Sequence, residues 1–99
     1  MNRSEIKNIF IKNGFSESLA DFVCIKCPFW QIDDVLQMAK DKKPEKTIIK
    51  SCFMQWDEGV FYSESDFEKY TSDNKKNAEQ EYRSHCNPDG SFRYEDFLN

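Results

Sequence analysis

The chain has 99 residues, of which 38% are hydrophobic, 15% are aromatic and 32% are charged, and its formal net charge is −4. This length fits one domain with a thin core, and the low content of glycine and proline, three of each, excludes a low-complexity or disordered chain. The acidic balance argues against a protein that binds nucleic acid directly through its phosphates, because such proteins present a clustered basic face.

The N-terminal half up to residue 43 predicts three short helices. Ser4 is a candidate cap for the first helix, which runs to about Asn13 and stops at Gly14. Ser16 or Ser18 opens the second helix. The second helix ends near Cys27, since the following proline disfavours helical backbone at the residue before it. The third helix has an apolar stripe at i, i+3, i+4 and i+7 and is closed by a proline; the stripe consists of Ile32, Val35, Leu36 and Ala39.

One loop between these helices resembles a known module. The stretch NGFSESLADF (13–22) is similar to the first loop of the three-helix ubiquitin-associated modules. That loop often reads Met-Gly-Phe, and here Gly14 and Phe15 match while Asn13 replaces the methionine. The resemblance covers less than half of the chain and implies three packed helices.

The pattern then changes to the alternation typical of strands. We predict a strand over 47–56 (TIIKSCFMQW), a turn at 57–59 and a returning strand over 60–63. A capping box at 65–68 starts a further helix, in which the polar stretch 71–77 is a candidate break. A turn at 87–90 leads to a third strand over 91–94.

Together these elements predict an α+β fold in a single domain, residues 1–99. An N-terminal three-helix layer would pack on a small antiparallel sheet, made of the hairpin and the C-terminal strand, with one further helical segment. We also expect a cytoplasmic protein, because no stretch approaches the ~18 apolar residues of a membrane span and the N-terminus lacks the apolar region of a signal peptide.

The four cysteines are the main candidates for chemistry. Cys24 and Cys27 have the C-x-x-C spacing and are followed by proline, while Cys52 and Cys86 could complete a tetrahedral all-thiolate zinc site. His85 is an alternative fourth ligand. With four protein ligands the zinc would be structural and would staple the fold. Two other interpretations stay open: small buried hydrophobic side chains, or a redox pair.

No catalytic motif is present. The sequence contains no glycine-rich phosphate loop, no H-E-x-x-H and no G-x-S-x-G. A Cys–His nucleophile pair would need a histidine placed against a cysteine in space, which adjacency of His85 and Cys86 in sequence does not provide. We therefore predict a protein that is not an enzyme.

The size, the acidic charge and the cysteines Cys24, Cys27, Cys52 and Cys86 together resemble those of anti-CRISPR proteins, small inhibitors carried by bacteriophages. This resemblance implies a protein that binds a CRISPR effector such as Cas9 and blocks the loading of nucleic acid. The expected partner-binding edge is acidic and consists of Asp57, Glu58, Glu64, Asp66 and Glu68. The alternative is a cytosolic zinc-stapled adaptor or regulatory module that binds another protein.

Overall fold

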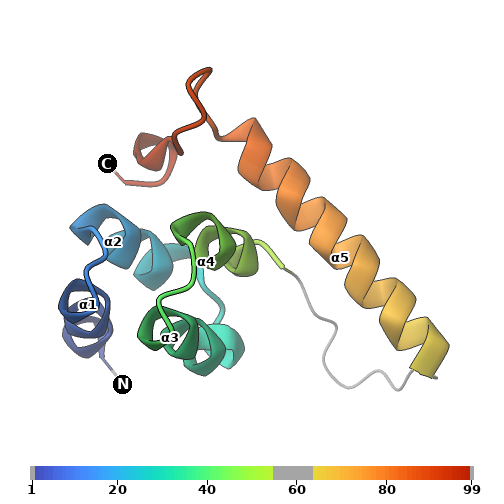
Figure 1. Ribbon diagram of the computed structural model, residues 1–99, viewed down its shortest axis with the longest axis horizontal. Helices are drawn as coiled ribbons and strands as arrows, with labels where there is room; N and C mark the ends of the chain where they lie inside the picture. Colours follow the sequence, from blue (N-terminus) through green and yellow to red (C-terminus); the bar gives the residue numbers. More distant parts are fainter. Residues whose placement is uncertain (1, 55–63, 99) are drawn as a thin grey trace.

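The computed structural model of the protein describes residues 2–54 and 64–98, with side chains for all of these except Trp30 and 64–71. Within these ranges the chain is built from α-helices joined by short turns (Figure 1). The helices are α1 (Arg3–Lys12), α2 (Glu17–Lys26), α3 (Ile32–Lys40), α4 (Glu45–Cys52) and α5 (Glu64–Ser84), with 3-10 turns η1 (Phe29–Gln31) and η2 (Tyr94–Asp96).

The three predicted N-terminal helices are confirmed. Asn2, rather than Ser4, caps α1, by accepting a hydrogen bond of 2.9 Å from the backbone N–H of Glu5. Ser16 caps α2 by accepting a hydrogen bond of 3.2 Å from the backbone N–H of Leu19. Gly14 lies between the two helices with a φ of +89°, a left-handed conformation that glycine adopts without strain.

The predicted α+β fold is wrong for the described residues, because the segment predicted as the first strand forms α4 instead. Four of its residues, Ile48, Ile49, Cys52 and Phe53, are at most 6% exposed. Their spacing of i, i+1, i+4 and i+5 covers one face of a helix as well as it covers two faces of a strand. Pro44, at the N-cap, suits a helix start because its missing N–H is not needed there.

The other two predicted strands do not form a sheet with it. The predicted turn at 57–59 and the strand at 60–63 lie outside the described residues. The segment 91–94 makes only an isolated antiparallel bridge, between Phe92 and Cys86, before it enters η2. The described part of the chain therefore contains no sheet for the three helices to pack on.

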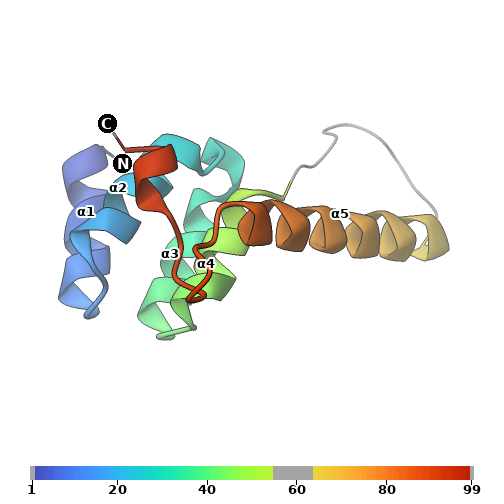
Figure 2. The ribbon, with the colours of Figure 1, turned by 90° about the horizontal axis from the view of Figure 1, so that it is seen from above.

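Helix α5 continues through the polar stretch 71–77 without the predicted break. Its 21 residues span about 30 Å at 1.5 Å per residue. Its C-terminal half packs beside α4, while its N-terminal half extends away from the other helices, as both views show (Figures 1 and 2). None of the helices in the described ranges combines the length and the apolar character of a membrane-spanning helix.

The core lies between α1, α2, α3 and α4, and its C-terminal side is closed by aromatic rings. Phe22 of α2 is fully buried. Its ring centroid lies 5.2 Å from that of Phe92, 6.1 Å from that of Tyr94 and 5.1 Å from that of Phe97. The Tyr94 hydroxyl also donates to the Glu45 carboxylate at the start of α4. The last residues thus fold back over α2 and α4 and complete the core.

Candidate functional site

The four cysteines predicted as zinc ligands point to different neighbours. The Cys27 thiol, at the end of α2, donates to the Pro28 carbonyl at 3.5 Å, and it is a neighbour of the Cys52 thiol of α4, whose pKa is raised by this neighbour and by burial. The Cys24 thiol instead donates to the Arg3 carbonyl at 3.9 Å, and the Cys86 thiol donates to the carbonyl one turn earlier in α5 at 3.1 Å. Cys27 and Cys52 are therefore neighbours, while Cys24 and Cys86 each bond to the backbone elsewhere in the fold.

The geometry gives the predicted zinc site no support. Among the residues whose side chains are described, 2–29, 31–54 and 72–98, no three side chains of the His, Cys, Asp and Glu types lie close enough together to hold a metal ion. The reason lies in the helices: Cys24 sits inside α2 and Cys27 at its end, so the C-x-x-C pair forms no knuckle in which both sulfurs face one ion. Zinc remains a prediction that elemental analysis can test.

The predicted acidic edge is only partly described. Asp57 and Glu58 lie outside the described residues. Glu64, Asp66 and Glu68 lie on the first two turns of α5, at the end that extends away from the other helices (Figure 2).

The only histidine takes part in an ion-pair cluster that holds the C-terminal segment. The Nδ1 atom of His85 lies 2.7 Å from Oδ2 of Asp96, and Arg93 Nε donates to the same oxygen at 3.2 Å. The two other guanidinium nitrogens donate to the carbonyls of Cys86, at 2.7 Å, and Ser84, at 2.8 Å. The hydrogen bond with His85, and then the charge of Arg93, lower the pKa of Asp96. This cluster joins the end of α5 to η2.

Among the described residues, no hydrogen bond joins the imidazole of His85 to the thiol of Cys86. The imidazole is bonded to Asp96 through Nδ1, and its ring centroid lies 4.8 Å from that of Phe97. The Cys86 thiol is bonded to the carbonyl of Tyr82 at 3.1 Å. The bonds of both side chains therefore serve the packing of the C-terminal segment.

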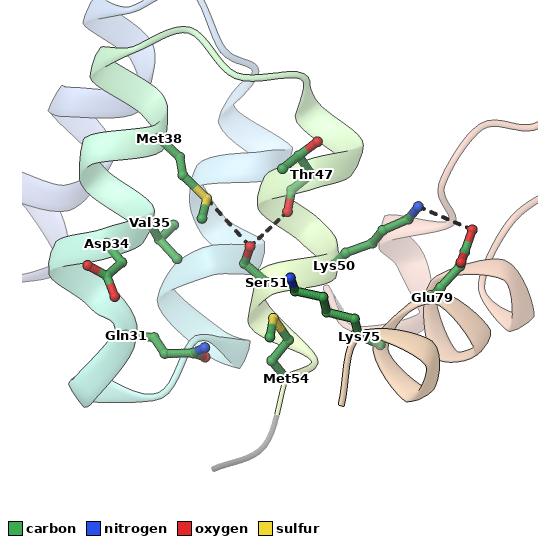
Figure 3. A pocket seen from close by; sticks show the side chains of 11 residues that line it. Gln31, Asp34, Val35, Met38, Thr47, Lys50, Ser51, Met54, Lys75 and Glu79 are labelled. Carbon is green, nitrogen blue, oxygen red and sulfur yellow. Dashed lines mark hydrogen bonds and ion pairs between the residues drawn. The ribbon is translucent and has the colours of Figure 1, made fainter. Parts of the chain in front are cut away.

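A pocket that the sequence did not indicate lies between α3, α4 and α5 (Figure 3). Its volume is about 520 Å³, within the range of ~300–1,000 Å³ that is typical of small-molecule sites. Apolar and sulfur-containing side chains line it from α3, from α5 and from the segment just after α4, namely Val35, Met38, Ala78 and Met54. The polar side chains at the pocket include Asp34, Lys50, Ser51, Lys75 and Glu79.

The polar groups at this pocket differ in how firmly they are held. Ser51 Oγ lies 2.9 Å from the Thr47 carbonyl of its own helix and 3.5 Å from Met38 Sδ (Figure 3). The Lys50 ammonium lies 3.6 Å from Glu79 and 5.3 Å from the centroid of the Tyr82 ring. Sequence reasoning missed this site because its residues come from three helices, and one of them was predicted to be a strand.

Comparisons with known proteins do not assign the chain to a family. No protein-family model, no curated protein and no solved structure matches it. The function therefore has to be argued from the residues and their arrangement.

Proposed function

We propose that this chain is a non-enzymatic protein-binding protein that engages a basic surface of its partner through the extended end of α5. The first candidate partner is a CRISPR effector such as Cas9, with the chain acting in the cytoplasm as a phage-encoded inhibitor of nucleic-acid loading. The resemblance to anti-CRISPR proteins suggests the class of partner, and the position of α5 in the fold suggests the binding element.

The observation that carries the proposal is the way α5 is attached. Among the α5 residues whose side chains are described, the hydrophobic ones that pack against the core, Ala78 and Tyr82, lie in the C-terminal half of the helix. The N-terminal half extends beyond the other helices in both ribbon views (Figures 1 and 2). A helix held at one end in this way can be inserted into a groove of a partner without disturbing the core.

The charge on this end of α5 suits a basic partner. Glu64, Asp66 and Glu68 bring three carboxylates into the first five residues of the helix, with no basic residue among them. Acidic residues also stabilise the start of a helix through its dipole. Opposite charges across an interface mainly accelerate association and select the partner, which makes salt dependence a suitable readout.

The competing function is an adaptor or regulatory module that binds a protein other than a nuclease. It would use the same end of α5, so a comparison of partners is needed to separate the two. Purified CRISPR nucleases, Cas9 first, would be incubated with the chain before the guide RNA is added, and cleavage of target DNA would be measured. In parallel, immobilised chain would capture partners from extracts of candidate host cells.

Two matched variants make this experiment specific. In the arm variant, Glu64, Asp66 and Glu68 are replaced by Gln, Asn and Gln. In the body variant, the exposed carboxylates Asp33, Glu81 and Glu95 are replaced by Asn, Gln and Gln, so both variants lose three charges. We expect the parent and the body variant to inhibit cleavage and the arm variant to lose inhibition.

The parent and the body variant, but not the arm variant, could capture a partner that is not a nuclease. This result would support the adaptor function and contradict the inhibitor function. Equal behaviour of the arm and body variants in both assays would refute the proposed role of α5.

A further inference from the structure

The pocket between α3, α4 and α5 has an apolar interior built from adaptable side chains. Val35 is fully buried and Ala78 is 2% exposed, while Met38 and Met54 are partly buried. Methionine side chains are unbranched and polarizable, so they adjust to ligands of different shape. Because Ser51 Oγ lies within hydrogen-bond distance of the Thr47 carbonyl, its hydroxyl is directed to its own helix. The interior therefore suits an apolar group.

Some of the charged side chains at the pocket form ion pairs with described residues and others do not. Glu79 is 3.6 Å from Lys50 and 2.9 Å from Arg83, so one carboxylate is shared by two cations. Lys75 lines the same pocket from α5 and is exposed, and it has no ion-pair partner among the described residues. In Figure 3 its side chain reaches from α5 toward α4, and that of Lys50 reaches from α4 toward Glu79. The α4–α5 side of the pocket therefore carries an excess of positive charge, while the carboxylate of Asp34 lines the opposite, α3 side.

We propose that this pocket binds a small amphiphilic anion, with an apolar body and a single carboxylate or sulfonate group. The apolar body would lie against Val35, Met38, Met54 and Ala78, and the anionic group would pair with Lys75. The proposal concerns the C-terminal half of α5 and does not depend on the function proposed for its acidic end.

The number of methionines provides a precise test. The chain has three, and two of them, Met38 and Met54, line the pocket. The third, Met1, precedes α1, and α1 contributes no residue to the pocket. Protein labelled with ¹³C in the methionine methyl groups therefore gives three signals, and a ligand in the pocket should shift those of Met38 and Met54.

Two aromatic probes would be titrated into this labelled protein. They are 8-anilinonaphthalene-1-sulfonate and N-phenyl-1-naphthylamine, which has the same rings without the sulfonate. We expect the sulfonate probe to bind with one-to-one stoichiometry, to shift the Met38 and Met54 signals, and to bind more tightly than the neutral probe. Fluorescence of the same probes gives the dissociation constants.

The contribution of Lys75 is tested by Lys75→Gln, with Lys76→Gln as control. Both lysines are exposed residues of α5, but only Lys75 lines the pocket. Removal of one partly exposed ion pair should weaken sulfonate binding roughly fivefold in Lys75→Gln and leave it unchanged in Lys76→Gln. The proposal is overturned if the probe leaves the Met38 and Met54 signals in place, if both probes bind equally well, or if the two variants bind alike.

Discussion

Phe22 provides the sharpest test of how the C-terminal segment completes the core. Its side chain is 0% exposed, and its ring contacts those of Phe53, Phe92, Tyr94 and Phe97 at centroid distances of 5.1 to 6.1 Å. Replacement of a buried phenylalanine by alanine lowers the free energy of unfolding by about 3–5 kcal/mol, and aromatic pairs, each worth about 0.5–1.5 kcal/mol, place a site toward the upper end of that range. With four ring neighbours, we expect Phe22→Ala to reach about 4.5 kcal/mol, near the upper end of this range.

Urea unfolding followed by far-UV circular dichroism would measure this loss. With a slope of about 1.5 kcal/mol per molar urea, the midpoint should fall by about 3 M. A domain of this size is stable by only about 5–15 kcal/mol, so Phe22→Leu serves as a milder variant, with roughly half the loss, in case the alanine variant does not fold.

The control for this prediction is Phe29→Ala, the same substitution at a side chain that is 78% exposed. It should change the free energy of unfolding by no more than about 0.5 kcal/mol. If Phe22→Ala and Phe29→Ala differ by less than about 1 kcal/mol, the aromatic cluster around Phe22 does not stabilise the fold in the way described.

Four further substitutions give distinct outcomes in thermal or urea unfolding. Asp96→Asn should lower the melting temperature at neutral pH. Because the pKa of Asp96 is lowered in the folded state, this difference should begin to shrink as the pH falls below the ordinary value of 3.8 and should vanish only below the lowered pKa of the folded state. Cys52→Ser, which buries a hydroxyl at a site 3% exposed, should lower the free energy of unfolding by about 1–3 kcal/mol, while the partly exposed Cys24→Ser should change it by less than about 0.5 kcal/mol. Equal large losses in both cysteine variants, together with loss of one zinc per chain, would instead support the zinc staple. Gly14→Ala should lower the free energy of unfolding by about 1 kcal/mol, since alanine at a φ of +89° is strained even with open space around it.

The first three helices could be predicted because several local signals agree. In α2, for example, Ser16 caps the start, Leu19 and Phe22 lie on the buried face, and the proline after Cys27 ends the helix. Each of these signals acts within a few residues, so no knowledge of the rest of the fold is needed to interpret them.

Helix α4 could not be predicted in the same way because its pattern is ambiguous. Ile48, Ile49 and Cys52 fit a strand by residue type and a helix by spacing, and β-branched residues favour the strand interpretation. The packing of α4 between α2, α3 and α5 decides in favour of the helix, and this packing is not visible in the sequence.

The same limit applies to the candidate sites. A C-x-x-C spacing states which cysteines are close along the chain, but the helical path of α2 sends Cys24 toward α1 and Cys27 toward Cys52. The pocket depends on side chains from three helices, and of these the sequence predicts only the apolar stripe of α3. Local spacing therefore predicted elements well and predicted sites poorly.

The most direct test of the proposed function is the affinity of guide-free Cas9 for the parent chain, the arm variant and the body variant, measured by titration at low and at physiological salt. The account predicts that the parent and the body variant bind alike, that the arm variant binds at least about tenfold more weakly, and that this difference shrinks as salt screens the charges. Equal affinity of all three proteins, or no binding of the parent, would contradict the proposal that the acidic end of α5 makes this chain an inhibitor of Cas9.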